Sequence, residues 1–454
     1  MNLALPNPHA AQAQAQVGLT TWPKWHAFQL LERLSDLRGN AAAGHLEMRV
    51  PEAATAALWV FVSTIGELNA IDPFLQQLAA RLSHLKLVLI TDHPHYASSY
   101  QSRFPDAVVC VTRGHGDDAR ALALHYPPSL LVVAEIPCLP SDAPCRFSFA
   151  FLLEAKRRGA DAVVVNGWLY HYAPACRMDS IERRLFQRDY LRAFDVMCVQ
   201  TESTRNELIG AGALPQRVVV TGNIKFDAMR RSDWSPAQAR SPQILRAMIE
   251  SGRPVIVAGC VTDFTEQAMV LDAFLYLRTL HADALLVIAP RHPEVTERMH
   301  KLHQMLSELS LQACFRSALP DMPLGQEIDC LVLDTTGDLR DFYATATVAH
   351  VGVDHNVLEP LAFGKPVSVA PGWQAIYPSY PVYRMMLDQQ GLSEALTGRG
   401  LGQLWATWIE QARQGELKIS RAEAALTHAR GAVDRHFKAL THCLQRVLQE
   451  GRQE

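Results

Sequence analysis

The sequence lacks several patterns that define common classes of protein. No run of about 18 uncharged apolar residues occurs, which predicts that no transmembrane helix forms. The first residues have neither a basic segment nor a continuous apolar run, so they do not look like a signal peptide. Because 43 Lys and Arg face 46 Asp and Glu, the net charge of −3 gives no reason to expect a nucleic-acid partner. Together these absences predict a cytoplasmic protein.

Several cofactor, metal and nucleophile signatures are also missing. The sequence has no P-loop, no GxGxxG after an apolar run, no GxSxG, no HExxH and no DxD pattern. Its nine cysteines are odd in number and contain no CxxC, which favours reduced thiols over disulfides or a zinc site. We therefore expect neither a metal nor a bound cofactor.

What the sequence has instead is a series of short apolar runs separated by helical stretches. Such continuous runs, alternating with helices, predict parallel strands buried on both faces of a sheet. A polar segment with two prolines, 229–243, separates two such series. The first series is Leu58–Thr64, Leu85–Thr91, Ala107–Thr112, Leu130–Glu135, Ala162–Gly167, Val196–Thr201 and Val218–Gly222. The second is Pro254–Gly259, Leu285–Pro290, Cys330–Asp334, Val348–Val353 and Pro366–Pro371.

The series predict an α/β protein with two Rossmann-like, doubly wound lobes that face a central cleft. We divide the chain into a tail and amphipathic helix (1–45), a first lobe (46–230), a linker (231–243), a second lobe (244–420) and a closing C-terminal helix (421–454). Ligands of such folds bind at the carboxyl ends of the strands.

The N-terminal helix, Trp22–Gly39, is predicted from apolar residues at helical spacing: Phe28, Leu31, Leu34 and Leu37. An ordinary amphipathic helix explains this pattern. A helix that lies on a membrane surface also explains it, since basic and aromatic residues cluster at its start.

Glu67 follows the first apolar run, after Ser63 and Gly66, where a helix is expected to begin. A carboxylate there stabilises the helix N-terminus, which is one interpretation. The other is a general base presented at the ligand-binding edge of the sheet.

Two strand ends of the second lobe carry polar groups that suit an anionic ligand, and a third, with Asn356 and Glu359, suits the diol of a ribose. Arg291 and His292 stand between two prolines after the run that ends at Pro290. Thr335, Thr336 and Gly337 follow the next run, in a layout that can seat a phosphate on backbone N–H groups. Asn356 and Glu359 follow the run after that. Ordinary surface loops and a capped helix remain alternative interpretations of these segments.

Together the motifs resemble the Kdo (3-deoxy-D-manno-octulosonic acid) transferases of lipopolysaccharide synthesis. The resemblance covers roughly residues 58–385. It rests on Ser63–Glu67, Gln200–Glu202, Val218–Asp227, Pro290–Glu294, Asp334–Leu339 with Tyr343, and His355–Pro360.

The resemblance implies a glycosyltransferase-B fold and inverting, metal-independent transfer of Kdo from CMP-Kdo to a lipid A precursor or a related glycolipid or saccharide. It makes Glu67 the general base. The implied donor-binding residues are Arg291, His292, Thr335, Thr336, Gly337, Asn356 and Glu359. The implied acceptor-binding or interlobe residues are Ser63, Gly66, Glu135, Asn166, Asn223 and Lys225.

The sequence departs from the family pattern at several positions. Pro137 and Leu139 replace a Glu and a Trp, Trp168 replaces an Arg, and Cys260–Glu266 replaces a more polar segment. The family's N-terminal hydrophobic anchor is also missing, so we expect at most a peripheral contact with the cytoplasmic face of the inner membrane. Two alternatives therefore remain open: a glycosyltransferase with another sugar nucleotide or acceptor, and a non-catalytic relative that acts as a binding protein.

Overall fold

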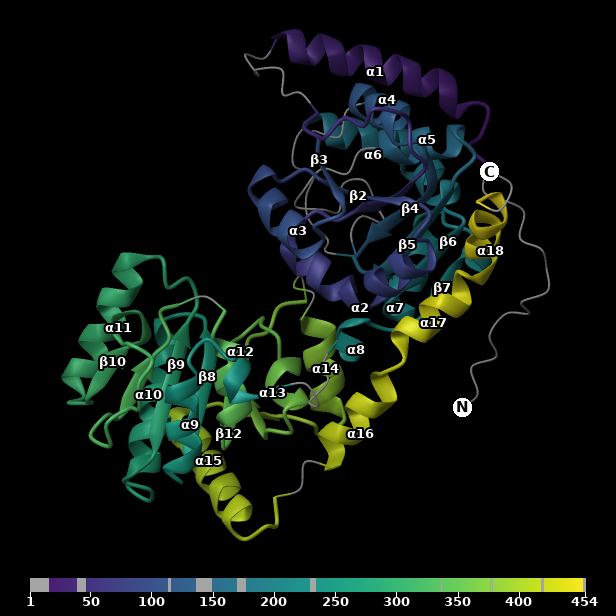
Figure 1. Cartoon of the computed structure of the whole chain (residues 1–454). Helices are drawn as coiled ribbons and strands as arrows, with labels where there is room; N and C mark the ends of the chain where they lie inside the picture. Colours follow the sequence, from purple (N-terminus) through teal and green to yellow (C-terminus); the bar gives the residue numbers. More distant parts are fainter. Residues whose placement is uncertain are drawn as a thin grey trace. The chain divides into compact units, whose positions relative to one another are not determined.

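The computed structural model describes residues 16–38, 46–112, 116–135, 149–169, 177–228, 234–335, 337–375, 377, 379–417 and 420–451 (Figure 1). The chain divides into two compact units. Unit 1 is Met1–Ala228 with Ala429–Glu454, and unit 2 is Met229–His428. Of the predicted site residues, Thr336 lies outside the described residues, as do 1–15 of the expected tail.

Unit 1 contains a seven-stranded, wholly parallel sheet with the strand order β3-β2-β1-β4-β5-β6-β7. Its strands all coincide with predicted apolar runs. They are β1 (Ala57–Phe61), β2 (Lys86–Thr91), β3 (Val108–Val111), β4 (Pro128–Ala134), β5 (Asp161–Gly167), β6 (Val196–Val199) and β7 (Val218–Val220).

Helices cover both faces of this sheet, as the alternation of side chains along β1 makes clear. Trp59 and Phe61 pack in a core with α4, α5 and α6, whereas Leu58 and Val60 pack in a second core with α2, α3, α17 and α18. The helices of unit 1 are α1 (Thr21–Arg38), α2 (Ile65–Arg81), α3 (Ala97–Arg103), α4 (Gly116–His125), α5 (Phe149–Arg157), α6 (Arg177–Ala193), α7 (Glu202–Ala211), α8 (Lys225–Ala228), α17 (Ala432–Ala439) and α18 (Thr441–Glu450).

Unit 2 repeats this architecture with a parallel seven-stranded sheet in the order β10-β11-β9-β8-β12-β13-β14. The strands are β8 (Val255–Val261), β9 (Leu285–Pro290), β10 (Ala313–Phe315), β11 (Cys330–Val332), β12 (Val348–Val351), β13 (Val367–Val369) and β14 (Ser393–Glu394). The helices are α9 (Pro242–Glu250), α10 (Phe264–Arg278), α11 (Thr296–Glu308), α12 (Leu339–Thr345), α13 (Leu358–Ala362), α14 (Tyr380–Asp388), α15 (Gly398–Arg413) and α16 (Ser420–Ala429). The predicted α/β class with two doubly wound sheets is confirmed.

Each strand order reverses at a central pair of strands, β1 and β4 in unit 1 and β8 and β12 in unit 2. The loops after such a pair run in opposite directions and leave a crevice at the carboxyl ends of the strands, where α/β folds bind ligands. Glu67, Glu135 and His355 follow β1, β4 and β12, and Cys260 lies near the end of β8. The topology therefore points to these residues as the centre of each unit's site.

Backbone irregularities mark the same edges. Asn166 and Cys260 have left-handed φ angles of 55° and 56°. They lie where the β5–β6 and β8–β9 registers shift. Glu135, His292 and Asp354 are also left-handed, with φ of 45°, 60° and 66°. Non-glycine residues rarely adopt this conformation, and bulges of this kind re-aim side chains beside functional sites.

Two helical predictions need correction. The expected single closing helix (421–454) is three helices, α16, α17 and α18. The break before α17 is at left-handed Gly431. The three helices nevertheless share a buried apolar face, formed by Leu426, Val433, Phe437, Leu440, Leu444 and Val447.

The predicted apolar stripe of α1 is wrong at Leu31 and Leu34. Leu31 and Leu34 are exposed by 43% and 49%, and the buried face is Trp25, Phe28, Gln29 and Glu32. Gln29 is buried because its amide packs against the backbone of Gly116 at the start of α4. None of the described helices combines the length and the hydropathy needed to cross a bilayer.

Candidate active site

Glu67 is the third residue of α2, and its side chain closes a capping box with the residues before the helix. The Thr64 hydroxyl accepts the backbone N–H of Glu67 and donates to Glu67 Oε1 at 2.9 Å. Glu67 Oε2 accepts the backbone N–H of Ser63, also at 2.9 Å. The interpretation of Glu67 as a helix-start acid is therefore confirmed.

Glu67 is also fully buried, which an ordinary helix-start acid is not. Burial raises the pKa of its carboxyl to about 8, and the nearby Glu135 carboxylate adds to this rise. The hydrogen bonds from Ser63 and Thr64 oppose it. A carboxylate with a pKa near neutrality is a much stronger base than an exposed one, so the local chemistry suits proton abstraction.

Glu135, at the end of β4, is the buried acid whose charge acts on Glu67. Its Oε1 lies 2.9 Å from Lys225 Nζ and accepts a hydrogen bond of 2.8 Å from Asn166 Nδ2. Both partners offer a polar contact to this buried side chain. The structure thus brings four predicted residues, Glu67, Glu135, Asn166 and Lys225, into one network.

Asn166 and Asn223 fix the loop that carries Lys225. Asn166 Oδ1 accepts the backbone N–H of Ile224 at 2.8 Å. Asn223 Oδ1 accepts the backbone N–H of Lys225 at 2.9 Å, and Asn223 Nδ2 donates to Gln200 Oε1 at 2.9 Å. The two asparagines are structural supports of the Lys225–Glu135 pair.

Ser63 and Gly66 behave differently from each other. Ser63 is buried, and its hydroxyl donates to Asp92 Oδ1 at 2.5 Å. Gly66 is exposed, and a Cβ there would meet only Thr64 Oγ1 at 3.7 Å, so packing does not require glycine at this position. Gly66 therefore has no structural role that the fold imposes.

Sequence reasoning missed a polar group that extends this site. Asp92 Oδ1 also lies 2.9 Å from His93 Nδ1, and the rings of His93, His95 and Tyr96 contact one another. The signal was available, because Asp92 and His93 directly follow the apolar run that forms β2. This group lies beside Ser63 at the same edge of the sheet.

In unit 2, Arg291 directly follows β9. Its backbone N–H donates to Val261 O, and its guanidinium faces the Tyr377 ring at 6.0 Å. Burial raises the pKa of Cys260 and Asp354, and the nearby positive charge of Arg291 opposes this rise. Burial lowers the pKa of His355 to about 4, and the charge of Arg291 adds to this fall.

Asn356 and Glu359 form a hydrogen-bonded pair. Asn356 Nδ2 donates to Glu359 Oε1 at 3.3 Å, and Asn356 Oδ1 accepts the backbone N–H of Leu358 at 3.1 Å. Burial raises the pKa of Glu359, while Asn356 and the charge of Arg340 oppose the rise. His292 instead turns to Glu294, with Nδ1 2.9 Å from Oε1, and is half exposed.

The loop after β11 holds Thr335 and Gly337. The Thr335 hydroxyl donates to Asp338 Oδ2, and the Asp338 side chain is buried. Gly337 is left-handed with φ of 96°, and the Arg240 guanidinium lies so close that a Cβ would meet it at 2.8 Å. Arg240, which belongs to the linker predicted from the sequence, thus adds a cation beside this loop.

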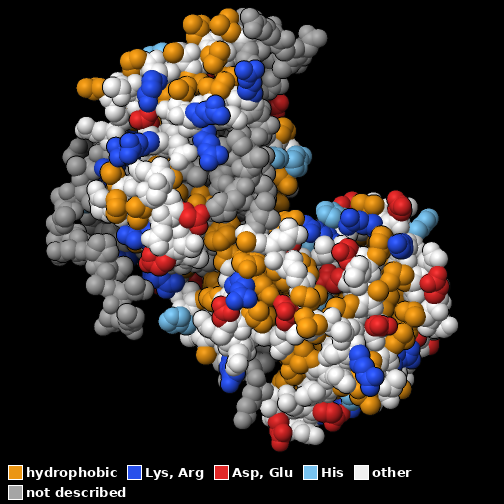
Figure 2. All heavy atoms as spheres, turned by 180° about the vertical axis from the view of Figure 1, so that it is seen from behind, with side chains coloured by type: hydrophobic (Ala, Val, Ile, Leu, Met, Phe, Trp, Pro, Cys, Tyr) orange, Lys and Arg blue, Asp and Glu red, His pale blue; other side chains and the backbone are white. Residues whose placement is uncertain are grey.

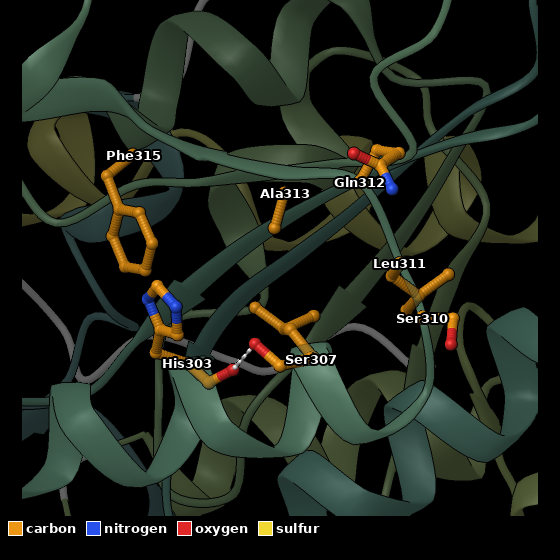
Figure 3. Close-up of a pocket in the computed structure, with 8 residues that line it drawn as sticks. His303, Ser307, Ser310, Leu311, Gln312, Ala313 and Phe315 are labelled. Atoms are coloured by element: carbon orange, nitrogen blue, oxygen red, sulfur yellow. Dashed lines mark hydrogen bonds between the residues drawn. The ribbon is translucent and has the colours of Figure 1, made fainter.

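A cavity elsewhere in unit 2 does not contribute to the site. A cavity of about 280 Å³ lies between α11 and β10, lined by His303, Ser307, Gln312, Phe315 and their neighbours (Figure 3). It contains no predicted site residue, and the His303 ring stacks on Phe315 at its rim. Among the described residues, no cluster of His, Cys, Asp and Glu has the arrangement of a metal site.

Comparisons with known proteins bear on the family of this chain. Residues 32–228 match the family model of the 3-deoxy-D-manno-octulosonic-acid transferases (Kdo transferases). The chain is 29% identical over 358 residues to a 3-deoxy-D-manno-octulosonic acid transferase of Bordetella pertussis, covering 74% of this chain and 76% of that protein. It is 23% identical over 398 residues to the Haemophilus influenzae protein of the same name, covering 86% and 87%.

A solved structure shares the two-domain fold. UDP-GlcNAc 2-epimerase from Neisseria meningitidis, bound to UDP-GlcNAc, superposes with a TM-score of 0.53 at 15% identity, covering 84% of this chain and 100% of that one. This likeness shows the glycosyltransferase-B fold, and the sequence relatives show the enzyme class. The family model and the sequence relatives support membership of the Kdo transferase family, and the names of the relatives support a glycosyltransferase.

Proposed function

We propose that this chain transfers Kdo from CMP-Kdo to a hydroxyl group of a lipid A precursor or a related glycolipid, with inversion and without a metal. Glu67 is the general base. The proposal is supported by the names of the curated relatives and, above all, by the burial of Glu67 beside Glu135 at the point where the strand order reverses.

The proton transfer follows from the charges around Glu67. As the acceptor oxygen attacks the anomeric carbon of Kdo, its O–H proton moves to Glu67, and the bond between that carbon and the CMP phosphate oxygen breaks. CMP leaves with the bonding electron pair. Protonation makes Glu67 neutral and thereby relieves its repulsion with Glu135, which favours this step.

Donor binding is assigned to unit 2. CMP-Kdo carries a phosphate and a sugar carboxylate, and both are anions. Arg291 lies at the carboxyl end of β9, and Arg240 lies beside the loop after β11, the neighbouring strand. Guanidinium groups at this edge stabilise both the bound donor and the charge that develops on the departing phosphate. Asn356 and Glu359 offer an amide and a carboxylate to the nucleotide.

The direct test is transfer itself. The purified protein is incubated with CMP-Kdo and a lipid A precursor in the presence of EDTA. Release of CMP and a mass increase of the acceptor by one Kdo residue are expected. If there is neither transfer nor CMP binding by calorimetry, the chain is a non-catalytic relative and the proposal is wrong.

A second sugar nucleotide or acceptor is favoured by one observation. Burial raises the pKa of Cys260 to about 12, so an uncharged thiol stands at the reversal point of unit 2, where the family pattern is more polar. Thermal-shift measurements with CMP, UDP and GDP separate the two donors. Stabilisation by UDP alone would favour this alternative, and stabilisation by CMP alone would exclude it.

A peripheral membrane contact through α1 is part of the proposal. Leu30, Leu31 and Leu34 are exposed by 61%, 43% and 49%, and Leu185 on the neighbouring α6 is also exposed. Figure 2 shows hydrophobic and basic side chains side by side on unit 1. The exposed Arg33 and Arg184 lie on these two helices. Apolar side chains flanked by cations suit the surface of an anionic lipid layer.

A further inference from the structure

His436 on α17 is a fully buried histidine that the proposed mechanism does not use. Its Nε2 lies 3.0 Å from the backbone nitrogen of Asn166 and 3.1 Å from Thr221 Oγ1. Its Nδ1 lies 2.7 Å from Ala432 O. The ring also contacts Phe74 of α2, with 5.8 Å between centroids. One side chain from the C-terminal segment therefore contacts α2 and residues at the ends of β5 and β7.

These contacts define the tautomer of His436. Ala432 O can only accept, so Nδ1 carries the hydrogen, and Nε2 is the acceptor for the Asn166 N–H and the Thr221 hydroxyl. Burial lowers the pKa of His436 to about 4, so the ring stays neutral near pH 7. The histidine is thus a fixed acceptor rather than a group that titrates during turnover.

The backbone N–H that His436 accepts belongs to Asn166, whose side chain holds Glu135. Asn166 occupies the left-handed position of a bulge, so its N–H points away from the regular ladder and needs another acceptor. His436 supplies it. The side chain of the same residue donates to Glu135 and accepts from Ile224. Fixing this backbone therefore fixes the amide that holds Glu135.

The start of α17 is itself attached to the site loop. Asp227 accepts the backbone N–H groups of Gly431 and Val433, each at 2.6 Å. The Arg435 guanidinium donates to Thr221 O at 2.8 Å. Asp227 shares the short helix α8 with Lys225, the ion-pair partner of Glu135. The segment around α8 thus connects the C-terminal helix to the site.

We propose that His436 is a positioning residue of the active site: by binding the backbone of Asn166, it holds Glu135 beside Glu67. The C-terminal helix α17 is then part of the catalytic apparatus rather than a closing element alone. This inference rests on the proposed function, because it takes Glu67 as the base whose activity depends on the position of Glu135.

The test compares two substitutions of His436. In His436→Asn, the shorter amide reaches Ala432 O but leaves the Asn166 N–H without an acceptor. In His436→Gln, the amide oxygen can occupy the position of Nε2. The control is Val447→Ala on α18, which creates a cavity in the same hydrophobic core without touching Asn166.

Amide hydrogen exchange of the β5 segment, kcat, KM and melting temperature are measured for each variant. His436→Asn is expected to exchange the Asn166 amide faster and to lose roughly 10-fold or more in kcat, with the KM for the donor little changed. His436→Gln is expected to restore the slow exchange of the Asn166 amide and the kcat in part. Val447→Ala is expected to lower the melting temperature but to keep the exchange rate and the kcat of the wild type. If His436→Asn does not fold, His436→Phe keeps the ring volume and carries the same expectations.

Two results would overturn the inference: unchanged protection of Asn166 in a folded His436→Asn protein, or faster exchange with unchanged kcat. Failure of the proposed function has a different signature. If Glu67→Gln keeps full activity, the base assignment is wrong, while hydrogen exchange still reports whether His436 holds Asn166.

Discussion

Lys225 Nζ lies 2.9 Å from Glu135 Oε1, and this pair places a compensated negative charge next to Glu67. Glu135 is almost completely buried, and Lys225 and the Asn166 amide compensate for the loss of water around its side chain. The cation stabilises one carboxylate, and that carboxylate in turn raises the pKa of the other. The two acids of the site therefore have different roles: Glu135 supplies a negative charge, and Glu67 is the carboxyl whose pKa that charge raises.

The Glu135 charge should be visible in the pH dependence of kcat. Glu67 must be ionised to act as a base, so kcat is expected to rise with pH up to its pKa of about 8. Glu135→Gln removes the neighbouring negative charge and lowers the pKa of Glu67. The rise should then move to lower pH. A profile that stays in place in Glu135→Gln would contradict the coupling.

Breaking the ion pair from the side of the cation should cost stability. Lys225→Met leaves the buried Glu135 carboxylate without its counter-charge, and we expect a loss of about 3 kcal/mol in the free energy of unfolding. The double variant Glu135→Gln, Lys225→Met removes both charges and should recover most of this loss. Urea unfolding at pH 7 compares the wild type, the single variants Lys225→Met and Glu135→Gln, and the double variant. Additive losses in the double variant would show that the pair is not coupled.

Removing the base should abolish transfer. Glu67→Gln keeps the size of the side chain but cannot take a proton, so kcat is expected to fall by roughly 10²- to 10⁴-fold. Glu297→Gln is the matched control, since Glu297 also lies in the first turn of a helix but is exposed. CMP release is the measurement. Equal rates in Glu67→Gln and the wild type would remove Glu67 from the mechanism.

The same substitution should stabilise the protein at high pH. The folded-state pKa of Glu67, about 8, lies above its ordinary value of 4.5, so the folded state binds the proton more tightly. Stability from this group is complete below pH 4.5 and is lost as the pH rises through 8. Glu67→Gln has no such loss. Its melting temperature relative to the wild type should therefore increase between pH 5 and pH 8.5, and a constant difference would contradict the raised pKa.

Much of the fold and part of the site follow from local sequence. The apolar runs predicted every strand except β10 and β14, which are short and lie at the edges of the unit 2 sheet, where strong hydrophobicity is not required. Glu67 and Arg291 were predictable because they directly follow such runs. The pairing of Glu67 with Glu135 was not, since it depends on the adjacency of β1 and β4.

Long-range contacts explain what the sequence could not predict. His436 is a single histidine in a helical pattern, and only the packing of α17 brings it to Asn166. Left-handed Asn166 and Cys260 carry no local signal, because glycine would be the expected residue at such positions. On α1, Gln29 and Glu32 are buried by their neighbours, against the hydropathy pattern.

Arg291 should act on the donor and not on stability. Arg291→Ala is expected to weaken CMP-Kdo binding about 10-fold or more, since a guanidinium that faces an anion is lost. Arg399→Ala on α15, whose cation faces the Tyr276 ring, is the control. Calorimetry with CMP and the KM for CMP-Kdo are the measurements. Unchanged values in Arg291→Ala would exclude a direct donor contact.

The exposed leucines of α1 should govern binding to lipid. Substituting Leu31 and Leu34 by Gln removes apolar surface that is not used in the core, so the folded protein should keep its melting temperature. Its binding to vesicles that contain an anionic phospholipid should fall several-fold, while binding to neutral vesicles stays weak. Leu448→Gln on α18, another partly exposed leucine, is the matched control. Vesicle co-sedimentation decides the matter: if the double variant and the control bind anionic vesicles equally, α1 is an ordinary amphipathic helix and its outer face has no part in membrane contact.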